Sequence, residues 1–123
     1  MATEFNTLAK NAGLQGILDW NPDALGTTIY MVAYSSDVDG AYVAHATATY
    51  GTPSSGAMDI TGNVTINIGA GNTITHLRIQ KMNASAPTTT AYPIYKKDVS
   101  SMAFTYAGTI TITSGEISLV DPA

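Results

Sequence analysis

Hydrophobic and polar residues alternate with a period of two along much of the chain, which is typical of half-buried β-strands. The stretch 63–68 places Val64, Ile66 and Ile68 on one side. In the stretch 41–50, one side carries a second regular set, made of Tyr42, Ala44, Ala46, Ala48 and Tyr50. The run 28–34 is apolar without alternation, which predicts a strand covered on both faces.

Two irregularities refine the strand prediction. In 73–82 the alternation changes phase, which predicts a β-bulge near Thr75 and His76. Pro93 lies inside the strand predicted at 92–97 and offers no backbone donor, so we expect this strand at the edge of a sheet. Further short strands are predicted at 58–61, 102–106, 109–113 and 117–120.

The first part of the chain carries the one helical pattern. Phe5, Leu8, Ala9 and Ala12 share a face at helical spacing, and Gly13 is expected to end these first turns before a further turn follows. The sequence Asn21-Pro22-Asp23 is a turn signal that separates this helical segment from the strands.

About eight short strands follow one another at a spacing of about 8–12 residues, which is typical of an all-β sandwich or barrel. The absence of helical patterns between them argues against a parallel α/β sheet. We therefore predict an all-β fold, an antiparallel β-sandwich of jelly-roll type with a short N-terminal helix. The chain of 123 residues is expected to be a single domain, 1–123, with a helical segment at 1–20 and the sandwich at 27–120.

Charged residues make up only 11% of the chain, against about 25% in a typical domain. Uncharged hydroxyl and amide side chains cost less to desolvate than ions, so such a surface suits burial against another protein. The net charge is −4 with five basic residues, which excludes a phosphate-binding surface and hence nucleic acid as a partner. No apolar stretch approaches the roughly 18 residues of a membrane span, so a soluble protein without membrane contact is expected.

Candidate chemical motifs all have a structural explanation. His45 and His76 lack further ligands at metal-binding spacing. The sequence 37–40 resembles the start of a calcium loop, but Ala48 stands where the loop needs a glutamate, so a hairpin turn is expected. Gly69-Ala70-Gly71 is interpreted as a turn. With no cysteine and no nucleophile motif, we expect no catalytic residue, no metal, no cofactor and no enzymatic activity.

Interface candidates come from large apolar and aromatic side chains. Tyrosine outnumbers the other aromatic residues, and its apolar body with a polar tip suits both a core edge and an interface. The candidates are Phe5, Leu8, Tyr42, Tyr50, Tyr92 and Tyr95. A carbohydrate-binding face built from some of the tyrosines is the alternative interpretation.

Four stretches of the chain carry a resemblance to a known group of proteins. They are Leu8–Asn11, Gly56–Val64, Gly71–Arg78 and Phe104–Thr113. Through these four stretches, the chain resembles small jelly-roll-like proteins encoded among bacteriophage structural genes. The resemblance rests on strand patterning and turn residues, and it brings no catalytic residues with it.

The resemblance implies a place in the virion, reached after assembly in the host cytoplasm. The expected function is that of a capsid decoration protein, and the alternative is a tail or collar component, possibly a receptor- or glycan-binding module. The expected partners are the major capsid protein or tail proteins, and further copies of the chain itself. A homotrimer is favoured because it matches the local threefold positions of a capsid.

Overall fold

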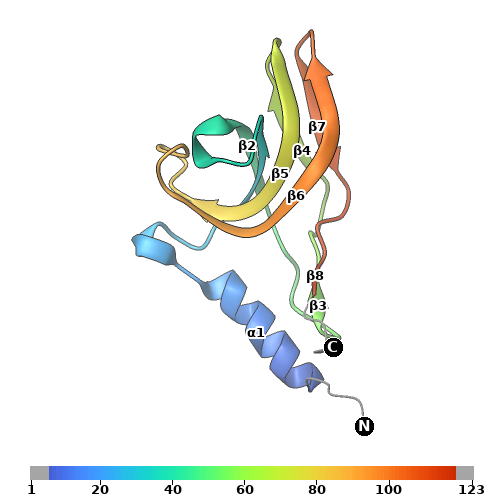
Figure 1. Cartoon of the computed structure of the whole chain (residues 1–123). Helices are drawn as coiled ribbons and strands as arrows, with labels where there is room; N and C mark the ends of the chain where they lie inside the picture. The colour runs from blue at the N-terminus through green and yellow to red at the C-terminus, as the bar shows by residue number, and fades with distance from the viewer. Residues whose placement is uncertain (1–5, 119–123) are drawn as a thin grey trace.

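The computed structural model describes residues 6–118, and it is mostly β-structure with one N-terminal helix (Figure 1). The helix α1 spans Thr7–Asp19, and two short 3₁₀ turns follow, η1 at Pro22–Ala24 and η2 at Asp39–Ala41. The strands are β1 (Ile29–Tyr34), β2 (Tyr42–Ala48), β3 (Ala57–Met58), β4 (Val64–Ile68), β5 (Asn72–Met82), β6 (Ala91–Phe104), β7 (Gly108–Ile112) and β8 (Ile117–Ser118).

All strand pairs are antiparallel, and they form one four-stranded sheet and two ladders of two strands. The sheet has the order β2-β1-β5-β6, and the ladders are β4–β7 and β3–β8. The strand β6 lies at the edge of the sheet, which confirms the prediction made from Pro93. The main core joins the sheet to the β4–β7 ladder, with Met31 and Ile74 on the sheet packed in one cluster with Ile66 and Ile110.

The strand β1 is buried on both faces, as the unbroken apolar run predicts. Met31 and Ala33 belong to the main core. Val32 and Tyr34 point to the opposite face and form a second, smaller cluster with Met82. A strand with this burial needs apolar side chains at every position, because neither face meets water.

Bulges change which residues share a face. The predicted bulge in β5 is confirmed, since its register with β6 shifts between Ile74 and His76. The pairing of β1 with β2 also shifts, and this shift places Tyr42 opposite Tyr34. The prediction that Tyr42 shares a side with Ala44 was therefore wrong: Ala44 packs on the main core, whereas Tyr42 packs on the second cluster. An extra residue in one strand of a pair interrupts the alternation of sides.

Helix α1 lies within the predicted segment 1–20 but is continuous where a break was expected at Gly13, and β6 is longer than the sequence pattern predicts. Helix α1 runs through Gly13 to Asp19, and Asn6 caps its start by accepting a hydrogen bond of 2.8 Å from the Leu8 backbone. The two strands predicted at 92–97 and 102–106 form the single strand β6. The polar residues between them continue the ladder to β5 instead of forming a turn, with Asp98 opposite His76.

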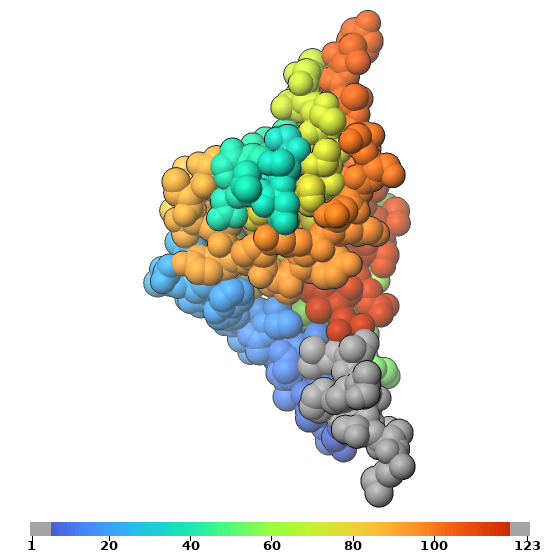
Figure 2. All heavy atoms as spheres, viewed as in Figure 1, coloured from blue at the N-terminus to red at the C-terminus, as the bar shows by residue number. Residues whose placement is uncertain are grey.

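Helix α1 lies beneath the strands, at the same end as β3 and β8 (Figure 1). Lys81 is 1% exposed, and its amine donates hydrogen bonds to the backbone oxygens of Leu18 and Trp20 at the end of the helix. The Asn11 side chain accepts a hydrogen bond of 2.9 Å from the Gly56 backbone beside β3. The other end of the molecule narrows to a tip formed by the β4–β5 and β6–β7 turns (Figure 2).

Candidate functional site

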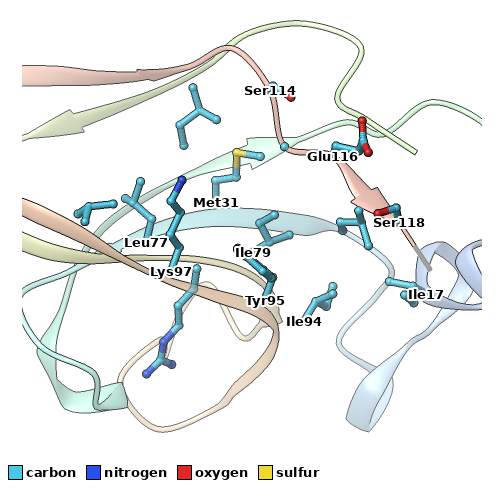
Figure 3. Close-up of a pocket in the computed structure, with 15 residues that line it drawn as sticks. Ile17, Met31, Leu77, Ile79, Ile94, Tyr95, Lys97, Ser114, Glu116 and Ser118 are labelled. Carbon is cyan, nitrogen blue, oxygen red and sulfur yellow. The ribbon is translucent and has the colours of Figure 1, made fainter. Parts of the chain in front are cut away.

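An apolar groove of about 840 Å³ lies between β6 and the chain segment that runs from β7 to β8. Figure 3 shows Ile17 of α1 at one end of this groove and Leu77 of β5 toward the other. The lining residues are Ile17, Met31, Leu77, Arg78, Ile79, Ile94, Tyr95, Lys97, Val99, Ile112, Ser114, Gly115, Glu116, Ile117 and Ser118.

The groove exposes part of the main hydrophobic core. Ile94 and Val99 of β6 and Ile112 and Ile117 on the facing segment pack against the core cluster, but each remains only partly buried. Met31, beneath them, is 2% exposed. The core is therefore closed beneath the groove and open along its mouth. A partly exposed row of large apolar side chains between two strand edges is a surface that another molecule can cover.

A hydrogen-bonded clamp fixes the wall of the groove that precedes β8. The carboxylate of Asp59 accepts hydrogen bonds from the backbone of Gly115 (2.8 Å) and Ile60 (2.7 Å) and from the Ser114 hydroxyl (3.1 Å). Tyr50 donates to the Gly115 carbonyl oxygen at 2.6 Å. The hydrogen bond from the Gly115 N–H is the main reason why the pKa of Asp59 is lowered. Burial raises the pKa of Tyr50. The clamp ties this wall to Tyr50, which follows β2, and to Asp59, which follows β3.

Arg78 lines the groove from β5, but its guanidinium lies on the opposite face of the sheet. It donates to Asp39 at 2.7 Å and to Asp37 at 3.4 Å, and it lies 4.0 Å from the centre of the Tyr34 ring. The two aspartates of the β1–β2 connection thus bind an arginine whose side chain is 1% exposed. Their role in the described structure is to hold the η2 turn on the sheet.

The six interface candidates lie at separate places. Tyr95 is 54% exposed and lines the groove. Tyr50 belongs to the clamp behind the groove. Leu8 is 78% exposed on α1. Phe5 lies outside the described residues.

The remaining two candidates make side-chain contacts away from the groove. Tyr42 is hydrogen-bonded to the ring of His45 and packs against Tyr34. Tyr92 lies against Trp20 with the ring planes at 79°, and it donates a hydrogen bond to Asp23. The structure therefore does not bring the four candidate tyrosines together into one face, although Tyr42 lies with Tyr30 and Tyr34 in the second cluster.

The groove residues Ile94, Val99 and Ile117 were missed as site residues because an apolar residue in a strand is normally assigned to the core. One signal was available for β6. Ile94 lies in the strand 92–97, which the sequence places at a sheet edge through Pro93, and apolar residues on an edge strand are candidates for contact with a partner.

Neither a metal-binding cluster nor a membrane-spanning helix occurs in the part of the chain that the structure describes. Within 6–118, no three His, Asp or Glu side chains lie close enough together to hold a metal ion. None of the helices in this part of the chain is long and apolar enough to cross a membrane.

Comparisons with protein-family models, with curated proteins and with solved structures found no match to this chain.

Proposed function

We propose that this protein is a structural protein of a bacteriophage virion, and that within the virion it is a capsid decoration protein. It works by packing against neighbouring subunits. The observation that carries the proposal is the groove, in which core side chains such as Ile94 and Val99 remain partly exposed. The bacteriophage setting comes from the resemblance of Gly56–Val64 and Phe104–Thr113 to small virion proteins.

The energetics of the surface support packing as the mode of action. Burial of apolar surface contributes about 25 cal/mol per Å², so covering the mouth of the groove stabilises a contact. The chain has only 11% charged residues, and a surface with few ions loses little hydration energy when a neighbour covers it. Weak contacts repeated on many identical capsid sites add up when the protein is itself an oligomer, for which we propose a trimer.

We also propose that the strands form a sandwich of jelly-roll type. A four-stranded antiparallel sheet packed against the β4–β7 ladder is compatible with a jelly-roll sandwich, in which two sheets enclose one core. In this arrangement the groove is the side of the sandwich that remains open between β6 and the β7–β8 segment. A neighbouring subunit closes that side.

The copy number of the protein in purified virions tests the proposal. We expect quantitative mass spectrometry to give a ratio of about one copy per major capsid subunit, because a decoration protein follows the capsid lattice. A few copies per particle would support the alternative, a tail or collar component. Absence of the protein from virions would contradict both.

Matched variants test the groove separately. Tyr95→Ala removes a half-exposed aromatic side chain from the groove and leaves the core intact, so incorporation into virions should fall while the melting temperature stays the same. Val99→Asp adds a charge to the lining, and Ser101→Asp adds the same charge to an exposed position of the same strand. We expect Ser101→Asp to be incorporated normally. If Tyr95→Ala and Val99→Asp are incorporated as well as Ser101→Asp and the parent protein, the groove is not the contact surface.

A further inference from the structure

The loop between α1 and β1 has an unusual backbone. Asp23 and Ala24 take positive φ angles of 50° and 57°, which L-residues rarely adopt in succession. The loop is held in this shape from within, because the Asn21 side chain accepts a hydrogen bond of 2.7 Å from the Gly26 backbone and Pro22 is buried. Strained backbone that the surroundings hold in place is a feature of binding sites.

This loop brings three side chains together at the surface. Trp20, the single tryptophan of the chain, is 41% exposed and packs edge-to-face with Tyr92 at 5.8 Å between ring centres. The Tyr92 hydroxyl donates a hydrogen bond to the Asp23 carboxylate. Figure 2 shows the loop against the first residues of β6 at the edge of the molecule. Trp20, Asp23 and Tyr92 are called the Trp20 patch below.

We propose that the Trp20 patch is a binding site for a neutral carbohydrate, with the C–H face of one pyranose ring against the indole of Trp20. This inference goes beyond the packing function and does not depend on the groove. An exposed aromatic ring offers a surface for the apolar face of a sugar, and a few polar groups beside it fix orientation through the hydroxyls. The Asp23 carboxylate and the Tyr92 hydroxyl supply those groups.

The charges around the patch select against other ligands. The buried Lys81 amine lies 5.9 Å from the centre of the Trp20 ring, so the ring already has a cation beside it and a cationic ligand meets repulsion. The Asp23 carboxylate repels phosphate and therefore nucleic acid. A neutral polyol meets neither repulsion. Its hydroxyls can donate to the carboxylate and accept from the indole N–H.

Tryptophan fluorescence reports directly on the patch, because Trp20 is the chain's single tryptophan. We expect cellotetraose or chitotetraose to change its emission saturably, with a dissociation constant between about 0.1 and 10 mM. A tetrasaccharide that binds more tightly than methyl β-glucopyranoside points to a polysaccharide, and equal affinities point to a free sugar. An unchanged emission up to about 20 mM of every one of these sugars overturns the proposal.

Variants locate the binding. Asp23→Asn keeps a residue type that tolerates positive φ and removes the charge, and we expect it to weaken binding about threefold or more. Trp20→Ala, followed by NMR chemical shifts, should weaken binding at least about tenfold. The control is Tyr106→Ala, which removes an aromatic side chain that is 83% exposed in the β6–β7 turn, and it should bind normally.

Two outcomes of the variant series overturn the proposal. Undiminished binding by both Trp20→Ala and Asp23→Asn places the sugar elsewhere. Loss of Trp20→Ala protein from virions, with no sugar effect on the parent protein, identifies the Trp20 patch as a protein contact. Because virion incorporation and sugar binding are measured separately, a failed sugar experiment leaves the decoration function open, and absence from virions leaves the sugar site open.

Discussion

Gly115 occupies a place in the groove wall where the chain passes close to other atoms. A Cβ atom at this position would lie 2.8 Å from the Tyr50 hydroxyl and closer still to the Met31 side chain. The same residue gives its N–H to Asp59 and its carbonyl oxygen to Tyr50. A side chain here would require the Met31 methyl group and the Tyr50 hydroxyl to shift, and both backbone groups of Gly115 take part in the clamp.

The first prediction concerns this close approach. Gly115→Ala should lower the free energy of unfolding by about 1–3 kcal/mol, because a methyl group is forced into a packed site. Gly62→Ala is the matched control, since a Cβ at Gly62 meets no atom within 4 Å. Urea unfolding of both variants measures the difference. Equal stability of the two variants would show that the clamp can move aside.

The second prediction concerns the acid sensitivity of the clamp. The pKa of Asp59 is lowered in the folded protein, mainly by the Gly115 N–H, whereas an aspartate in the unfolded chain titrates near 3.9. A lowered pKa means that this stabilisation is present above about pH 4 and is lost as the pH falls through the folded value. Asp59→Asn should therefore be less stable at pH 7 and approach the parent protein below about pH 3 in urea titrations. A constant difference at all pH values would contradict the linkage.

At the residue scale, the sequence indicates which residues are unusual but not what they contact. Asp37 and Asp39 were correctly assigned to a tight connection between strands. Their partner Arg78 stands 39 residues after Asp39, and no local pattern connects the two. Asp59 and Gly115 are likewise brought together only by the folded chain. Side-chain partners of this kind depend on the tertiary structure and are not encoded in periodicity.

Among the elements, helix α1 is attached along one face only. Leu14 is wholly buried, whereas Leu8 is 78% exposed six residues earlier on the same helix. The helix is held within its first half by the hydrogen bond between Asn11 and Gly56, and at its final turn by Lys81. The two leucines therefore report on a buried and an exposed position of one element.

The third prediction uses this pair. Leu14→Ala should lower the free energy of unfolding by about 2–4 kcal/mol, because it removes a fully buried side chain and leaves a cavity. Leu8→Ala should change it by less than about 0.5 kcal/mol in the isolated protein. Thermal or urea unfolding of both variants is the measurement. A large effect of Leu8→Ala in the isolated protein would mean that α1 packs through its other face in solution.

Strand positions follow from the sequence where a single face is buried. Val64, Ile66 and Ile68 are all buried in β4 and alternate with exposed residues, as predicted. The pattern is less informative in β6, where exposed polar residues between the two predicted strands continue one long ladder. It also fails at Tyr42, because the register shift in the pairing of β1 with β2 changes the face without changing the residue types. Continuity and register depend on the neighbouring strand.

At the scale of the whole molecule, the small number of charges affects how readily copies of the chain associate. The chain carries nine acidic and five basic residues, and its isoelectric point is about 4.7. Self-repulsion is weak at neutral pH and vanishes near the isoelectric point. A surface of this kind permits contact between copies.

The fourth prediction follows from this balance. Self-association, measured by light scattering at fixed protein concentration, should increase as the pH falls from 8 toward about 5, because the net negative charge declines. Added salt should reduce the difference between the two pH values by screening the charges. A scattering signal that does not change with pH would show that charge does not limit contact between copies.

The groove as a whole was beyond prediction from sequence, although Pro93 marks one of its walls as an edge strand. Its walls come from β6, which pairs with β5 in the four-stranded sheet, and from the segment after β7, which pairs with β4 in a separate ladder. The lining residues look like ordinary core residues in the sequence. The opening between the walls depends on how the layers are placed, and that placement appears only in three dimensions.

The clamp also has a consequence for the order of folding. Tyr50 reaches the Gly115 carbonyl across 65 positions of the chain, and β3 pairs with β8 over a similar separation. Contacts between such distant residues form slowly, because a long loop has to close first. During synthesis, the β1–β2 hairpin can form early, but the wall that carries Gly115 has to wait for the ribosome to release that segment. Until then the nascent chain exposes more of its core than the finished protein does, and this interval is when chaperones or premature contact between nascent copies have the greatest effect.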